Sequence, residues 1–99
     1  MADKQVPGGY GPTEDANQEI QEHCDQVKHQ VEKDTGESYL EFKAIKYRRQ
    51  TVKGTNFLIK VHVGGPDYVH LIVFRELGGK VSLTKVQDHQ TKDSPLQHF

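Results

Sequence analysis

The spacing of apolar residues changes once along this chain of 99 residues, and that change constrains the fold most. From Asn17 to Gly36 the apolar residues recur every three or four positions, which is the repeat of one helix face. They are Ile20, Cys24, Val27 and Val31. Asparagine is a favoured helix N-cap, and glycine commonly follows the last helical residue. The spacing therefore predicts one amphipathic helix of about four turns.

After residue 36 the apolar residues alternate with polar ones, as they do in half-buried strands. The alternation covers residues 39–47, 56–63, 68–77 and 81–86. Glycine-rich segments at 64–67 and 77–80 are typical of turns between neighbouring strands. The order predicts an α+β fold in which one amphipathic helix packs on a four- to five-stranded antiparallel sheet.

A sheet covered by one helix buries one face and leaves the other in water. Residues of strand 56–63 and strand 68–77 divide accordingly, and the apolar set is Phe57, Ile59, Val61, Val63, Val69, Leu71 and Val73. Ile72 falls on the other face beside Lys60 and His62. Single exposed apolar residues are common, so we expect Ile72 to lie exposed without further consequence.

The length of 99 residues fits one domain, residues 1–99, with residues 1–12 as a flexible N-terminal trunk. Thirteen basic residues against fourteen acidic ones give a formal charge of −1, which argues against nucleic acid as a partner. No segment approaches the length of a membrane span, and no membrane partner is expected.

Cys24 is the one cysteine of the chain, so an internal disulfide is excluded. A secreted domain of this size usually carries several disulfides, which favours a reducing compartment. Residues 1–11 contain no apolar stretch of the kind found in secretory signals. We therefore expect a cytoplasmic location.

The chain shows no set of residues typical of an enzyme. Cys24 lies on the apolar helix stripe, where a core role is expected. His62 and His70 would face each other if Val63 paired with Val69. Two such imidazoles could hold copper or zinc weakly, although two solvated histidines are the simpler interpretation. We expect no catalytic residue, no metal site and no cofactor.

Gln50-Thr51-Val52-Lys53-Gly54 fits the Gln-x-Val-x-Gly signature of the cystatin superfamily at each fixed position. The chain also resembles that family at Pro7-Gly8-Gly9, at Asp25-Gln26-Val27 in the helix, and at residues 59–64 and 70–74. The absence of disulfides and of a signal-like segment makes the chain most similar to the type-1 cystatins, the stefins.

The resemblance implies a reversible, tight-binding inhibitor of papain-like cysteine proteases such as cathepsins. In this family a wedge of three segments blocks the active-site cleft of the protease. The corresponding residues here are Val6, Pro7 and Gly8 in the trunk, Gln50, Thr51, Val52, Lys53 and Gly54 in the first hairpin loop, and Leu77 and Gly78 in the second.

The chain departs from stefins at two places. Stefins usually carry Leu-Pro where this chain has Leu77-Gly78, and glycine makes that loop more mobile. Stefins mostly have Val and Ala where this chain has Thr51 and Lys53. Lys53 adds a charged group near the tip of the wedge, and the hypothesis is that it favours proteases with acidic clefts.

Two alternatives stay open on the sequence. The chain could be a non-inhibitory binding or structural protein on a cystatin scaffold, with weak metal binding through His62 and His70. Stefin-like chains also exchange part of the fold through the first hairpin loop. We expect a monomer, and a domain-swapped dimer is the alternative.

Overall fold

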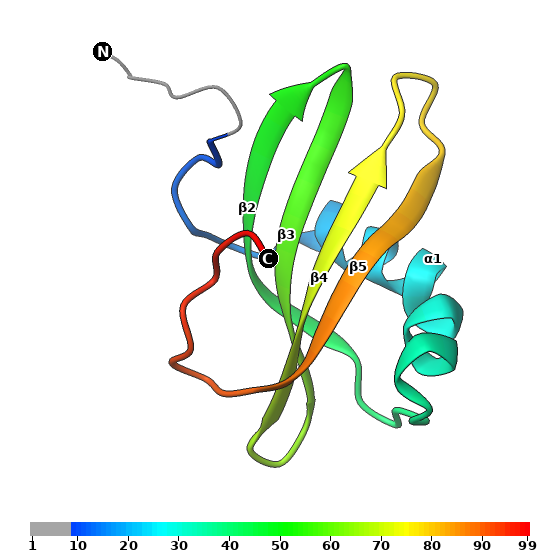
Figure 1. Cartoon of the computed structure of the whole chain (residues 1–99), viewed down its shortest axis with the longest axis vertical. Helices are drawn as coiled ribbons and strands as arrows, with labels where there is room; N and C mark the ends of the chain where they lie inside the picture. The colour runs from blue at the N-terminus through cyan, green and yellow to red at the C-terminus, as the bar shows by residue number, and fades with distance from the viewer. Residues whose placement is uncertain (1–8) are drawn as a thin grey trace.

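The computed structural model describes residues 9–99, so Val6, Pro7 and Gly8 lie outside the described residues. The elements in chain order are β1 (Glu14–Asp15), α1 (Gln18–Thr35), β2 (Lys43–Val52), β3 (Gly54–Gly64), β4 (Asp67–Arg75) and β5 (Val81–Gln90). The strands form one antiparallel sheet in the order β1-β2-β3-β4-β5, with α1 behind it in Figure 1. The predicted α+β architecture is confirmed.

Helix α1 begins and ends where the capping residues predict. The main-chain N–H of Ile20 donates to Asn17 Oδ1 at 3.0 Å, which satisfies one of the free donors of the first turn. Gly36 adopts a φ of 75°, and its N–H donates to the carbonyl of Glu32. The predicted stripe of Ile20, Cys24, Val27 and Val31 is buried against the sheet.

The helix-facing side of the sheet is the main core. It contains the alternating residues Phe57, Ile59, Val61, Val69, Leu71 and Val73, with Tyr47 from β2. Val63 is partly buried at the margin of this cluster. The period-two pattern of the strands therefore predicted the buried face correctly.

Strand β2 begins at Lys43, and the prediction of a strand from residue 39 is wrong. The N–H of Tyr39 donates to Glu32 Oε2 at 2.8 Å, which holds the segment against the end of α1. The rings of Tyr39 and Phe42 stack with centroids 5.7 Å apart. These aromatic residues therefore cover the helix end instead of joining the sheet.

The expectation that Ile72 lies exposed is also wrong. Ile72 is only 2% exposed and forms a second apolar cluster with Leu58 and Leu96 on the face away from the helix. Tyr10 and Phe99 pack against this cluster. Residues 91–99, which we call the tail, lie over that face, as the red segment of Figure 1 shows. The second face is therefore covered in part by the two ends of the described chain.

Lys60 fixes the start of the tail. Its ammonium group donates to the carbonyl oxygens of Thr91 at 2.6 Å, Lys92 at 2.8 Å and Ser94 at 2.8 Å. The lysine side chain is buried beneath these residues, and burial lowers its pKa. The hydrogen bonds offset the cost of removing a charge from water.

The predicted pairing of His62 with His70 is wrong because β3 is irregular between His62 and Gly64. This irregularity sets Val61 opposite Val69 and His70 opposite Lys60. His70 is fully buried, and burial together with the charge of Lys60 lowers its pKa to about 4. The two histidines are thus neither paired across the strands nor both solvated.

In residues 9–99 we find no helix that is both long and apolar enough to cross a membrane.

Candidate functional site

The β2–β3 and β4–β5 turns lie at the same end of the sheet, because successive turns of an antiparallel meander alternate between the two ends of the strands. Figure 1 shows both turns at the upper end of the molecule. We call residues 50–54 the first loop and residues 76–80 the second loop. The end of the sheet that carries both loops is called the loop edge. The two predicted hairpin segments are therefore brought together by the fold.

The first loop is closed tightly by its own strands. Val52 pairs with Gly54, so Lys53 alone connects β2 and β3. Behind the turn, Asn56 Nδ2 donates to Gln50 Oε1 at 2.7 Å across the two strands. This hydrogen bond joins side chains on the face opposite the helix and ties the bases of the loop together.

Gly54 meets two requirements at once. Its φ of 106° lies in a region that residues with a side chain rarely adopt, as the predicted tight hairpin requires. In addition, a Cβ at this position would lie 2.5 Å from the carbonyl oxygen of Arg75 and 2.8 Å from Cζ of Phe74. The second requirement comes from the close approach of β4, which the sequence motif does not indicate.

The second loop is more open. The N–H of Gly79 donates to the carbonyl of Glu76, and the N–H of Glu76 donates to the carbonyl of Lys80, both at 2.8 Å. Gly79 has a φ of 101°, as in hairpins that combine a turn with a glycine bulge. Leu77 is 84% exposed, and no atom lies within 4 Å of a Cβ built on Gly78. The loop presents Leu77 to solvent.

The described chain starts beside the first loop. Gly11 donates its N–H to the carbonyl of Arg49 at 2.8 Å, one residue before Gln50. Residues 9–11, which we call the N-terminal segment, therefore lie beside β2 at the base of the first loop. The roles expected for Val6, Pro7 and Gly8 stay predictions, as do the roles of the residues in both loops.

Arg75 lies just before the second loop, is held by contacts to α1 and β3, and was not among the residues predicted from the sequence. It is the last residue of β4, it pairs with Glu19 of α1, and its guanidinium lies 5.1 Å from the ring centroid of Phe57. His23, buried nearby, has a pKa that burial lowers. The only sequence signal for Arg75 is its position just before the Leu77 turn.

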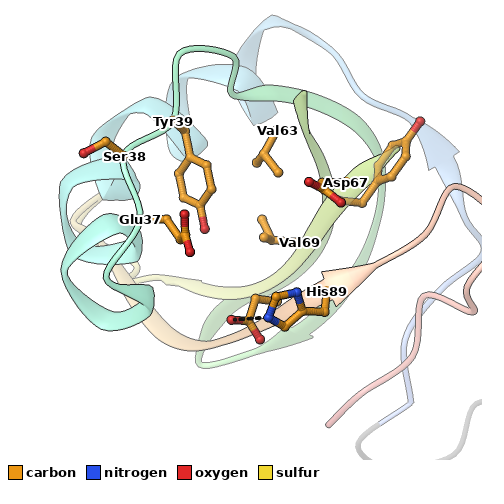
Figure 2. A pocket seen from close by; sticks show the side chains of 9 residues that line it. Glu37, Ser38, Tyr39, Val63, Asp67, Val69 and His89 are labelled. Atoms are coloured by element: carbon orange, nitrogen blue, oxygen red, sulfur yellow. Dashed lines mark ion pairs between the residues drawn. The ribbon is translucent and has the colours of Figure 1, made fainter. Parts of the chain in front are cut away.

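A cavity of about 190 Å³ lies at the opposite edge of the sheet, between the segment after α1 and the ends of the strands (Figure 2). It is lined by Glu37, Ser38, Tyr39, Val63, Asp67, Tyr68, Val69, Asp88 and His89. Most small-molecule sites are larger, at about 300–1,000 Å³. Across residues 9–99 no three His, Cys, Asp or Glu side chains are arranged to hold a metal ion.

Cys24 has no access to a substrate. It is fully buried on α1, and burial followed by the charge of Asp25 raises its pKa to about 12. A thiol acts as a nucleophile in its deprotonated form, which this environment disfavours. The predicted core role of Cys24 is confirmed.

Comparison with known proteins supports the family resemblance that the motif at residues 50–54 indicated. A family model described as Cystatin domain matches residues 8–94, which include both loops. Cystatin-A of Mus musculus is 43% identical over 96 residues, covering 95% of this chain and 99% of the relative. Leukocyte cysteine proteinase inhibitor 1 of Sus scrofa is 43% identical over 101 residues, covering 99% and 98%. Cystatin-B of Oplegnathus fasciatus is 41% identical over 95 residues, covering 93% and 95%.

Proposed function

Because the chain belongs to the cystatin family, as a type-1 cystatin (stefin), we propose that it is a reversible, tight-binding inhibitor of papain-like cysteine proteases such as cathepsins. Members of this family are protease inhibitors and not enzymes. The observation that carries the proposal is the placement of the two loops at one edge of the sheet, next to the N-terminal segment.

The loop edge has the surface of a binding site. Three large apolar side chains are well exposed among residues 9–99, namely Leu40, Val52 and Leu77. Val52 and Leu77 both lie at the loop edge, on the first and second loops. Exposed apolar groups gathered at one place mark interaction surfaces, whereas a single one such as Leu40 has no such meaning.

The wedge works by covering the protease cleft. Val52 at the centre and Leu77 beside it would bury apolar surface against the cleft walls, while Val6, Pro7 and Gly8 would extend toward the non-primed subsites. Because β2 and β3 already hold the first loop in place, docking costs little further ordering. The catalytic cysteine and histidine of the protease are then blocked, and no bond of the inhibitor needs to be offered for cleavage.

Lys53 is expected to adjust which proteases are bound most tightly. It is exposed at the turn of the first loop, between Val52 and Gly54. Charged groups at an interface mainly affect association rate and partner choice. Lys53→Ala should weaken inhibition of a cathepsin with an acidic cleft more than inhibition of one with a neutral cleft. Equal changes for all proteases would contradict this role.

The inhibitory form in this proposal is the monomer. Exchange of strands between two copies would open the turn at Lys53 and remove the first loop from the loop edge. A swapped dimer should therefore be inactive. Size-exclusion chromatography followed by a papain assay of each fraction measures this directly, and full inhibition by a dimer fraction would contradict it.

We place the protein in the cytoplasm within this proposal. Its one cysteine is buried in the core as a free thiol, which suits a reducing compartment. Cell fractionation with an antibody against the protein tests the location.

The proposal is tested by titrating papain and a cathepsin with the intact protein, with a variant lacking residues 1–8, and with Val52→Asp. The intact protein should inhibit with a constant below about 1 µM. A carboxylate at Val52 would enter an apolar contact, so Val52→Asp should weaken inhibition by about 100-fold or more. Removal of residues 1–8 should also weaken it.

Leu40→Asp is the matched control, because Leu40 is an exposed apolar residue before β2, at the edge opposite the loops. It should inhibit like the intact protein. Absence of inhibition by the intact protein would reject the proposal and favour a non-inhibitory role on this scaffold.

A further inference from the structure

Arg48 contacts both ends of the described chain with one side chain. Its Nε donates to the carbonyl of Gly11 at 2.7 Å and its Nη2 to the carbonyl of Tyr10 at 3.2 Å. Its Nη1 donates to the carbonyl of Leu96 at 2.9 Å. The guanidinium carbon also lies 5.9 Å from the ring centroid of Tyr10. We call this set of contacts the Arg48 clamp.

The guanidinium group is suited to this task because it is planar and carries its donors in a fixed fork. Hydrogen bonds from a charged donor are roughly twice as strong as neutral ones. Gly11 is held from both sides, since its N–H donates to the carbonyl of Arg49 while its own carbonyl accepts from Arg48. The clamp therefore fixes the backbone of the N-terminal segment against β2.

The tail is also held in place by contacts that do not involve Arg48. Lys60 binds three carbonyl groups of the tail, and Leu96 packs on Leu58 and Ile72. Arg48, Leu58 and Ile72 lie directly across neighbouring strands, so the clamp and the apolar cluster form one row. Leu96 thus offers its carbonyl to Arg48 from a position that the sheet determines.

Tyr10 links the two ends a second time. Its hydroxyl lies 3.1 Å from Nδ1 of His98, and the two rings are 5.7 Å apart. Tyr10 is therefore placed between Arg48 on one side and His98 on the other. Two separate contacts tie the N-terminal segment to the tail.

The clamp lies at the base of the wedge, because Arg48 is two residues before Gln50 and Tyr10 is two residues after Gly8. Resting on the proposed function, we propose that Arg48 is a positioning residue for inhibition. It fixes Tyr10 and Gly11, the part of the trunk that follows residues 1–8, and it makes the affinity of residues 1–8 for the protease depend on the tail. Ordering this point before binding lowers the entropy cost of docking the trunk.

The test is a cycle of inhibition constants for papain. Arg48→Ala is measured in the full chain and in a chain lacking residues 1–8, with Arg49→Ala as the matched control. The Arg49 guanidinium donates to the Tyr47 hydroxyl and lies over its ring, and within residues 9–99 it makes no hydrogen bond to the tail or to Tyr10 and Gly11. Arg48→Ala should weaken inhibition about tenfold in the full chain and less than about twofold in the shortened chain, because the trunk carries the effect.

Arg48→Lys retains the charge and guards against a folding defect in the alanine variant. Lysine carries its three N–H donors on one nitrogen and cannot spread them over the carbonyls of Tyr10, Gly11 and Leu96 as the planar guanidinium does, so the same trunk-dependent loss is expected at a smaller size. A variant that ends at Pro95 lacks Leu96 and His98. It should inhibit papain less strongly than the full chain, and this loss of inhibition should again be smaller when residues 1–8 are absent.

The outcomes separate the two proposals. If the intact protein does not inhibit papain, the proposed function fails, and the positioning role fails with it. If it inhibits, but Arg48→Ala costs the same factor with and without residues 1–8, the positioning role alone is overturned. The same undiminished loss for the chain ending at Pro95 would mean that the tail touches the protease itself.

Discussion

The first and second loops lie at one edge of the same sheet, but different parts of the chain hold them. The first loop has a single connecting residue, Lys53, a side-chain hydrogen bond at its base, and a glycine fitted beneath β4. The second loop has two main-chain hydrogen bonds and a glycine, Gly78, with open space around it. One loop is packed into the fold, whereas the other projects from it.

This difference suggests separate roles for the residues of the two loops. In the first loop the backbone conformation and the close approach of β4 favour glycine at Gly54, and we propose that Val52 contacts the protease, so one short motif would serve two purposes. In the second loop we propose a contact role for Leu77, and the open space around Gly78 predicts that this residue can change without disturbing the fold. The departure at Gly78 from the usual Leu-Pro of stefins occurs in the loop that accepts change more readily.

Gly54→Ala should have the largest effect. The added methyl group would require a strained φ and would overlap the carbonyl of Arg75. Strain of this kind costs about 1–3 kcal/mol, and the overlap adds to it, so the free energy of unfolding should fall by about 3 kcal/mol. Urea unfolding measures the change, and papain inhibition should weaken in parallel.

The comparison between the loops would break if Gly54→Ala unfolded at the same urea concentration as the parent protein. In that case β4 must move aside easily, and the first loop would be no more constrained than the second.

Leu77→Ala should affect binding without affecting folding. The side chain is 84% exposed, so its removal should change the free energy of unfolding by less than about 0.5 kcal/mol. In a protease complex it would be buried, and losing most of a leucine side chain costs about 1–2 kcal/mol, or roughly tenfold in the inhibition constant.

Equal inhibition by Leu77→Ala and the parent protein would show that the second loop does not touch the protease. A large loss of stability would show instead that Leu77 packs on the fold, against its exposure in the structure.

Asn56→Ala should loosen the base of the first loop. It removes the donor to Gln50, and a side-chain hydrogen bond of this kind contributes about 1 kcal/mol. The free energy of unfolding should fall by about that amount. In a double-mutant cycle with Gln50→Ala, the two losses should not add, because both variants remove the same bond. Additive losses would mean that the pair contributes nothing to holding the loop.

The helix, the helix-facing core and the two loops could be predicted from the sequence because each depends on local rules. Asn17 caps the helix through its side-chain oxygen and Gly36 through its left-handed backbone conformation, and the alternation around Phe57 and Ile59 follows from strand geometry. Gly54 was identified by its motif. These features require only neighbouring residues to be known.

The second face of the sheet could not be predicted because distant residues determine it. Ile72 is buried by Leu96, and Lys60 is satisfied by carbonyl groups 31 to 34 residues further along the chain. The irregularity in β3 after His62 sets Val61, and not Val63, opposite Val69 on β4. The alternation of apolar residues fits either pairing, so it could not indicate this register. The contact between Gly54 and β4 has the same origin, since it joins residues on two strands.

Gly78→Ala should have the smallest effect and the opposite sign to Gly54→Ala. Gly78 does not adopt a positive φ, and no atom lies within 4 Å of the added methyl group. Replacing glycine at such a position stabilises a protein by about 0.4–1 kcal/mol, because the unfolded chain loses conformational freedom. Thermal unfolding of Gly78→Ala beside Gly54→Ala therefore compares the two loops in one experiment.

Proline at the same position gives the sharper form of this test. Proline disfavours the helical backbone region for the residue before it, so Gly78→Pro would restrict the backbone of Leu77 within the turn closed by Gly79 and Glu76. We expect Gly78→Pro to be less stable than Gly78→Ala and to inhibit papain differently from the parent protein. If alanine destabilised the protein as much as proline, the second loop would be as closely packed as the first. The contrast between the loops would then be lost.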